Sequence, residues 1–223
     1  MDQRVVALLA LTSGTAVANL YYSQPLMKAI CRTFQASEAT TGLAVAAIQF
    51  GYAAGLVLLV PLGDVLEHRR LVVSLVAAST LGLVGVALSP SLPAFALAAL
   101  LLGLTTVVAQ IVVAVAANLA GKSERGRVVG TVMTGLLIGV LLSRTFAGAL
   151  AELSGWRTVY WVAAALILIL STVLWRWLPR GNAINSIPYP DLLRSVANLL
   201  CEEPVLRRRA LYGALQFGAF NTL

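Results

Sequence analysis

Charged residues are scarce in this sequence. They make up 11% of its 223 residues, against 59% hydrophobic residues, whereas a soluble domain carries about 25% charged residues. This scarcity excludes an ordinary soluble domain. The charges that are present are unbalanced, with 16 Lys and Arg against 9 Asp and Glu, a net charge of +7. In a membrane protein such an excess sets the topology, so we expect no nucleic-acid partner.

Residues that support catalysis or bind metals are scarce as well. The single histidine, His68, cannot supply the two histidines of an H-E-x-x-H zinc site. The two cysteines, Cys31 and Cys201, form no cluster, and the chain has no G-x-x-x-x-G-K-[ST] phosphate loop. We therefore predict a protein that is not an enzyme, that holds no metal and no cofactor, and that does not itself use ATP.

Long apolar runs dominate what the sequence does contain. Runs of about twenty residues recur, the length with which an α-helix crosses ~30 Å of hydrocarbon. The strands of a membrane barrel would alternate polar and apolar residues, and these runs do not alternate. The sequence predicts an all-α, polytopic membrane helix bundle whose surroundings are the lipid bilayer. We expect six spans, at about 5–24, 39–62, 71–88, 93–119, 128–150 and 157–178.

The basic residues predict the orientation of these spans, because positive charge marks cytoplasmic loops. With a cytoplasmic N-terminus, 12 of the 16 Lys and Arg residues lie on the inner side. The other four, on or near the outer side, are Lys28, Arg32, Arg144 and Arg157. The uneven distribution predicts a multi-pass protein with its N-terminus in the cytoplasm.

The sequence divides into three predicted regions. Residues 1–178 form the six-helix bundle. Residues 179–209 form a cytoplasmic connector, in which Asp191 begins an amphipathic helix that we expect on the membrane surface. Residues 210–223 begin a seventh span, but these 14 residues reach only about 21 Å, so the sequence predicts a truncated seventh helix.

Small residues recur at helix-packing spacing in two of the spans. Span two carries Gly51 and Gly55, and span five carries Gly135 and Gly139. Glycines four residues apart share one face of a helix and let two backbones approach closely. Plain helix packing is therefore the predicted role of these glycines.

A short motif occurs twice. LGDVLEHR (62–69) and LAELSGWR (150–157) share the pattern of a leucine, a small residue, an acid, four further residues and an arginine. The pattern aligns Asp64 with Glu152, each at the exit of the second span in a set of three. Three spans per copy place the two copies in opposite orientations. The sequence thus predicts an inverted 3+3 repeat, which is typical of transporters that work by alternating access.

The motif resembles one of the major facilitator superfamily, in its bacterial drug:proton antiporter-like branch. Leu62, Gly63, Asp64, Arg69 and Arg70 match the family's loop between helices two and three. The segments NLYYSQPL, SERGRVVG and GALAELSGWR are similar to other parts of that branch. The resemblance covers the whole chain, but only the first half of a family member plus part of helix seven. It implies a bacterial inner-membrane protein with protons as a second transported species and a missing C-terminal half as its partner.

Two positions depart from the family's proton-antiport pattern. Ala99 stands where family members often carry an arginine in helix four. Arg144 replaces the proline of the family's helix-five pattern. Both departures bear on proton coupling and not on the fold.

The resemblance also implies a cytoplasmic gate. Asp64, at a helix end, would pair with Arg125 or Arg127 in one state of the transporter and release it in the other. From spacing alone, a topology signal made of solvated charges explains these residues equally well. The full set of predicted gating and loop residues is Gly63, Asp64, Arg69, Arg70, Arg125, Arg127, Glu152 and Arg157.

Polar residues inside the spans are candidates for a substrate cavity. Gln49 lies about 15 Å into span two, near the midplane where transporter sites lie, and is the first candidate. Arg144 is the one formal charge deep in a span, where it either snorkels to the outer surface or takes part in binding or gating. The predicted cavity residues are Asn19, Tyr22, Gln49, Tyr52, Gln110 and Arg144.

Together these patterns predict a secondary active transporter, or the N-terminal half of one, that moves a small solute by alternating access. Proton-coupled efflux is the form that the resemblance implies. Two alternatives stay open, namely an uptake symporter for a metabolite and a truncated remnant that transports nothing. Span one contains no carboxylate, so nothing marks a cationic solute. Sugars, organic acids, amino acids and drugs all stay open.

Overall fold

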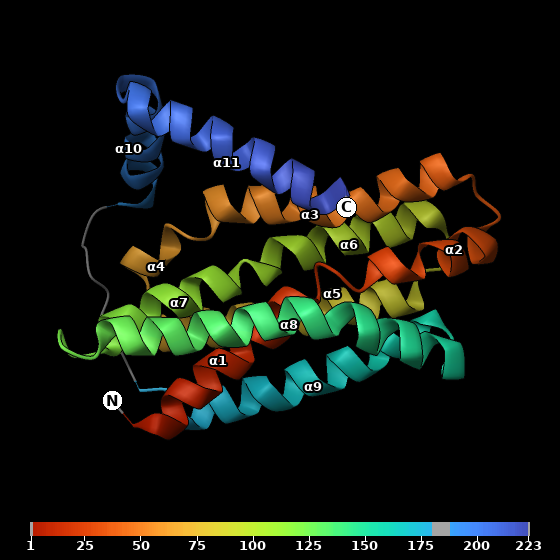
Figure 1. Ribbon diagram of the computed structural model, residues 1–223, viewed down its shortest axis with the longest axis horizontal. Coiled ribbons are helices and arrows are strands. Elements are labelled where there is room, and N and C mark those ends of the chain that lie inside the picture. The colour runs from red at the N-terminus through yellow and green to blue at the C-terminus, as the bar shows by residue number, and fades with distance from the viewer. Residues whose placement is uncertain (1, 180–187, 223) are drawn as a thin grey trace. The chain divides into compact units, whose positions relative to one another are not determined.

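The computed structural model describes residues 2–179 and 188–222, and within them the chain consists of helices and the loops that join them (Figure 1). It divides into two compact units, residues 1–184 and 185–223. The helices are α1 (Gln3–Ala18), α2 (Ser23–Phe34), α3 (Glu38–Leu58), α4 (Leu62–Val65), α5 (His68–Leu88), α6 (Leu92–Thr106), α7 (Val108–Leu119), α8 (Arg125–Ser154), α9 (Trp156–Trp177), α10 (Tyr189–Glu202) and α11 (Pro204–Thr222).

Six segments of the first unit are long and apolar enough to cross a membrane, which confirms the six predicted spans and the all-α fold. The helices extend beyond the span ends that hydropathy predicts. The first span continues to Phe34, as α1 followed by α2, and the fifth runs from Arg125 to Ser154 as the single helix α8. The difference arises because a helix continues through the headgroup region, where polar residues are tolerated.

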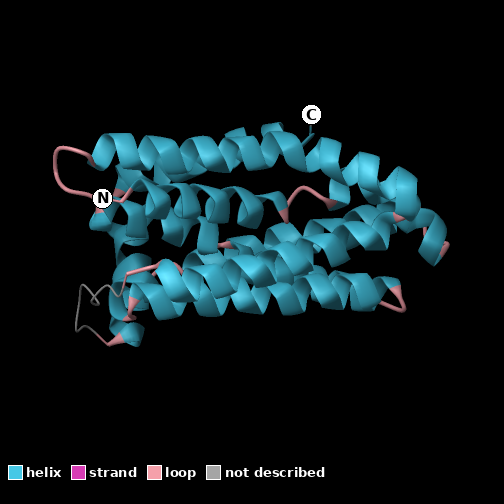
Figure 2. Ribbon diagram, turned by 90° about the horizontal axis from the view of Figure 1, so that it is seen from below, coloured by secondary structure: helices cyan, strands magenta, loops and turns pink. Residues whose placement is uncertain are grey.

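Local signals fix where several helices begin. The Asp2 side chain accepts a hydrogen bond from the N–H of Arg4 at 2.9 Å, and Ser37 does the same for Thr40 at 3.1 Å. These side chains satisfy backbone donors that have no partner within the helix. Between α8 and α9 the chain turns at Gly155, whose φ of 87° favours glycine. Figure 2 shows the helices joined by short loops of this kind.

The first helix of each predicted repeat is interrupted near its middle. α1 ends at Ala18 and α2 begins at Ser23, while α6 ends at Thr106 and α7 begins at Val108. The intervening residues include no proline and no glycine, so hydropathy and turn signals did not predict either interruption. Asn19 and Val107, where the two interruptions begin, are 88 positions apart, as are Asp64 and Glu152. The interruptions therefore occupy the same place in both copies of the repeat.

The packing of the spans follows the same symmetry. α1 packs against α8, α3 against α6, and α5 against α9. The first span of each set of three thus contacts the second span of the other set. The third spans of the two sets contact each other. In Figure 1 these helices run side by side within the first unit. This arrangement is the one expected of an inverted 3+3 repeat.

Glycines allow the paired helices to approach closely, as their spacing predicts. A Cβ atom at Gly139 of α8 would overlap the backbone of Gly14 in α1. A Cβ atom at Gly51 of α3 would overlap the carbonyl of Leu100 in α6. Gly51 and Gly139 are again 88 positions apart, so one glycine position makes a close helix contact in both copies.

The second unit contains α10 and α11. α10 begins at Tyr189, two residues before Asp191, the predicted start of an amphipathic helix. Asp191 forms an ion pair with Arg194 at 3.6 Å within this helix. α11 begins at Pro204, earlier than the apolar run predicted from residue 210. The location of α10 on the membrane surface stays a prediction.

Candidate functional site

Two polar side chains from different spans meet within the first unit. The Nε2 atom of Gln110 in α7 donates a hydrogen bond to the hydroxyl of Tyr52 in α3 at 3.0 Å. We call Tyr52 and Gln110 the central polar cluster, and both are predicted cavity residues. Arg144 of α8, another predicted cavity residue, is exposed.

The central polar cluster lies at depths typical of a transport site. Tyr52 stands at the midpoint of the span Glu38–Val65. Arg144 lies about 7 Å beyond the midpoint of α8, and about 15 Å of helix follow it. Because α8 extends to Ser154 and not to residue 150, Arg144 lies farther from the end of its helix than the sequence predicts.

Two amide side chains have buried polar atoms without a hydrogen-bond partner among the described residues. Asn19 is fully buried at the interruption between α1 and α2, and neither its Oδ1 nor its Nδ2 atom is paired. The Oε1 atom of Gln49, about one turn before Tyr52 on α3, is also buried and unpaired. Leaving a buried amide unpaired costs about 1–3 kcal/mol. These groups are therefore available to a polar molecule bound beside them.

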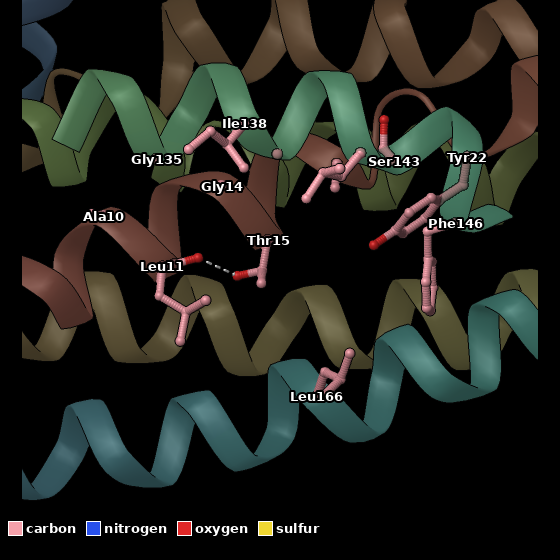
Figure 3. Close-up of a pocket in the computed structure, with 13 residues that line it drawn as sticks. Ala10, Leu11, Gly14, Thr15, Tyr22, Gly135, Ile138, Ser143, Phe146 and Leu166 are labelled. Atoms are coloured by element: carbon pink, nitrogen blue, oxygen red, sulfur yellow. Dashed lines mark hydrogen bonds between the residues drawn. The ribbon is translucent and has the colours of Figure 1, made fainter. Parts of the chain in front are cut away.

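Tyr22 lies in a different place from the other predicted cavity residues. It lines an apolar cavity of about 360 Å³ between α1, α8 and α9, together with Gly14, Phe146 and Leu166 (Figure 3). Its ring lies 6.3 Å from that of Phe146 and 6.4 Å from that of Tyr160. The cavity has almost no polar lining, so it suits an apolar group. The place of Tyr22 in a substrate cavity stays a prediction.

The predicted ion pair of Asp64 is not formed in this structure. Asp64 is exposed in α4 and has no ion pair among the described residues. The Nε atom of Arg125 donates to the carbonyl of Ala117 at 2.8 Å, and Arg127 pairs with Glu124 at 3.0 Å. Both arginines thus have local partners in this state.

Most other residues of the loop motif lie at helix ends. Gly63 belongs to the four-residue helix α4. Arg70 forms an ion pair with Glu67 at 3.0 Å at the beginning of α5. Glu152 is exposed two residues before the end of α8 and, within the part of the chain that the structure describes, has no ion pair. None of these contacts joins the two repeats.

Arg157, by contrast, connects two spans. It donates hydrogen bonds to the carbonyls of Ala87 at 3.1 Å and Ser89 at 2.9 Å, at the end of α5. Its guanidinium also lies 4.3 Å from the ring centroid of Trp156. Arginine at the C-terminal end of a helix satisfies carbonyls that have no partner within the helix. These contacts give Arg157 a role in packing, which the sequence did not predict.

Arg69 occupies the matching position in the other repeat. Its guanidinium lies 4.8 Å from the ring centroid of Trp175, near the end of α9. Trp175 and Ala87, the contact of Arg157, are 88 positions apart. Each arginine therefore lies at the start of the third span of one repeat and contacts the end of the third span of the other repeat.

Comparison with known proteins agrees with this architecture. The family model described as Major Facilitator Superfamily matches residues 6–223. The "Uncharacterized transporter YgaY" of Escherichia coli O157:H7 is 48% identical over 223 residues, which are all of this chain and 57% of that protein. The "Probable transporter SCO4007" of Streptomyces coelicolor is 32% identical over 216 residues, 97% of this chain and 50% of that protein.

A solved structure has a similar fold. It is a bacterial homolog of the human lysosomal transporter Spinster, in an inward-facing and occupied conformation. It superposes with a TM-score of 0.72 at 19% identity, over 81% of this chain and 45% of that one. The chain thus spans about half the length of the proteins that it matches.

Proposed function

Because the chain belongs to the Major Facilitator Superfamily, we propose that it forms the N-terminal half of a secondary active transporter that moves a small solute across a bacterial inner membrane. The match of the family model over residues 6–223 carries this proposal. Its relatives have the names of transporters and not of enzymes. In this proposal the additional length of those relatives corresponds to a second half, against which this half moves during alternating access.

The proposed solute path passes the central polar cluster. Secondary transporters bind solutes near the bilayer midplane, at interrupted helices on the interface between repeats. Two features support the same arrangement here, namely the interruptions that begin at Asn19 and Val107 and the midpoint position of Tyr52. The unpaired amides of Asn19 and Gln49 would add hydrogen-bonding groups to this path.

The proposed cytoplasmic gate is the ion pair of Asp64 with Arg125 or Arg127. All three side chains are exposed, so exchanging their present contacts for a mutual pair requires no burial of an unpaired charge. Exposed pairs contribute only about 0–1 kcal/mol each, which suits a contact that must form and break in every cycle. In this proposal the structure represents the state with the gate pair broken.

The proposed orientation places the N-terminus in the cytoplasm, because 12 of the 16 basic residues then lie inside. Proton-coupled efflux is the proposed form of transport, supported by the resemblance to the antiporter branch. The alternative is uptake by symport. The acids of the described spans lie at the span ends, so their positions favour neither proton antiport nor proton symport. A pH gradient imposed on proteoliposomes distinguishes the two by the direction of solute movement.

The gate proposal is tested by Asp64→Asn in the full-length protein. We expect this variant to insert into the membrane at the level of the unmodified protein and to lose solute transport, because a neutral side chain cannot form the ion pair. Glu67→Gln is the matched control, since it removes a neighbouring carboxylate whose partner is the local Arg70. Transport by Asp64→Asn at the rate of the unmodified protein would refute the gate.

A further inference from the structure

A pocket with charged walls lies where α1 begins and α9 ends, at one end of the first unit (Figure 1). Its volume is about 480 Å³. The residues that line it are Asp2, Arg4, Val5, Arg176 and Trp177. The two arginines belong to the first and the sixth span, and the fold brings them to one pocket. This pocket is therefore suited to a charged group, unlike the apolar cavity beside Tyr22.

The two guanidinium groups of the pocket are free to bind a ligand. Within the residues that the structure describes, neither Arg4 nor Arg176 forms an ion pair or a hydrogen bond through its side chain. The acid of the pocket is Asp2, whose Oδ1 atom accepts a hydrogen bond from the backbone N–H of Arg4 at 2.9 Å. Two arginines and one carboxylate leave the lining with one net positive charge. A single phosphodiester, which is a monoanion, would balance it.

The pocket lies at the depth of lipid headgroups. Arg4 is the second residue of the span Gln3–Phe34, and Arg176 is the last but one of the span Trp156–Trp177. Trp177 lines the pocket and is 50% exposed, and tryptophan is enriched at the interface between membrane and water. A phospholipid beside these two spans would therefore bring its phosphate to the level of the two arginines.

The helix face that continues from Arg176 into the membrane suits acyl chains. Ala165 and Ile169, eleven and seven residues before Arg176, share its face of α9 and are exposed. Thr172 lies between them, and its hydroxyl donates to the carbonyl of Ile169 at 2.6 Å. This face thus presents apolar surface next to a pocket that presents positive charge, which is the order of groups in a phospholipid.

A topology signal made of solvated charges is the alternative explanation for Arg4 and Arg176. That role depends on how many basic residues lie on one side of the membrane, and it does not require two of them to share a pocket. A soluble phosphate compound would use the arginines but not the apolar face of α9. Basic pockets between membrane helices on the cytoplasmic side are typical binding sites of anionic lipid headgroups.

We propose that Arg4 and Arg176 together bind the phosphodiester of an anionic phospholipid, phosphatidylglycerol, whose acyl chains lie along α9. In the proposed orientation this lipid belongs to the cytoplasmic leaflet. The site lies outside the proposed solute path and does not depend on transport, so the two proposals can fail separately. The bound lipid would connect the start of the first span to the end of the sixth.

The test measures lipid binding to the full-length protein in detergent by native mass spectrometry. The probes are phosphatidylglycerol, phosphatidylethanolamine and phosphatidylcholine with the same acyl chains, and inorganic phosphate is the competitor. We expect phosphatidylglycerol to bind about tenfold more tightly than the two neutral lipids, because only its headgroup carries a net negative charge. The double variant Arg4→Gln/Arg176→Gln should lose this preference. The matched control is Arg207→Gln/Arg208→Gln, which removes the same charge from exposed positions of α11 and should retain the preference.

Equal affinity for the three lipids, or tighter binding of phosphatidylethanolamine, would overturn the proposal. Equal losses in the two double variants would show that net charge alone attracts the lipid, which would overturn the pocket. Displacement of the lipid by inorganic phosphate would assign the site to a soluble anion. A second measurement locates the lipid without any variant. Phosphatidylglycerol with a photoreactive headgroup should label peptides that contain Arg4 or Arg176, and labelling confined to other peptides would contradict the site.

Discussion

At the scale of single residues, Arg157 determines how the end of α5 meets the start of α9. Its two hydrogen bonds, to the carbonyls of Ala87 and Ser89, act where the helix leaves its last carbonyls unpaired. The negative end of the helix dipole and the face of the Trp156 ring add attraction for the guanidinium. Arg157 therefore acts in helix packing, and its part in a gate stays a prediction.

Arg157→Ala should lower the melting temperature of the protein in detergent. Each lost hydrogen bond to a charged group costs about 1.5–3 kcal/mol. Hydrogen bonds from water to the exposed carbonyls replace the lost bonds only in part. The melting temperature of Arg157→Lys should lie between those of Arg157→Ala and the unmodified protein, because one ammonium cannot reproduce the planar fork of the guanidinium. Arg32→Ala is the control, since Arg32 is exposed in α2. Equal melting temperatures for Arg157→Ala and Arg32→Ala would contradict this role.

Contacts between single residues are also the features that the sequence predicts least well. The repeat related Arg157 to Arg69, but the partners of Arg157 lie 68 and 70 positions away in the chain. Tyr22 lines the apolar cavity, whereas its buried neighbour Tyr21 does not. No sequence signal separates the two tyrosines, because their directions depend on the geometry of the interruption between α1 and α2.

At the scale of elements, span positions and helix contacts could be predicted because simple physical limits determine them. Bilayer thickness fixes the span length, and four-residue glycine spacing indicates which helix faces approach closely. The interruptions at Asn19 and Val107 were missed because they contain no proline or glycine. Their equal placement in the two repeats indicates that packing between repeats, and not local sequence, maintains them.

Gly139→Ala and Gly130→Ala should change stability in opposite directions, although both lie in α8. Alanine favours a helix over glycine by about 1 kcal/mol. At Gly130 nothing lies within 4 Å of an added Cβ atom, so this gain should raise the unfolding temperature. At Gly139 the added atom would overlap the backbone of Gly14, so the α1–α8 pair must separate and stability should fall. An increase in stability for both variants would show that the close contact is absent.

At the scale of the whole molecule, the six spans form two sets of three that are inverted copies. The shared acid-to-arginine motif, the paired interruptions, the glycine contacts and the two arginines at helix ends all follow one offset of 88 positions. The sequence alone predicted the inversion because three is an odd number of crossings. The contact of Tyr52 with Gln110 joins residues 58 positions apart in the chain, so spacing along the chain did not reveal it.

The most direct test of this arrangement measures which side of the membrane each motif faces. Leu66→Cys and Leu153→Cys place single thiols at exposed positions in the two related turns, after Cys31 and Cys201 are replaced by serine. A membrane-impermeant maleimide applied to intact cells should label Leu153→Cys and spare Leu66→Cys. In inside-out vesicles the pattern should reverse. Labelling of both thiols from the same side would contradict the inverted repeat.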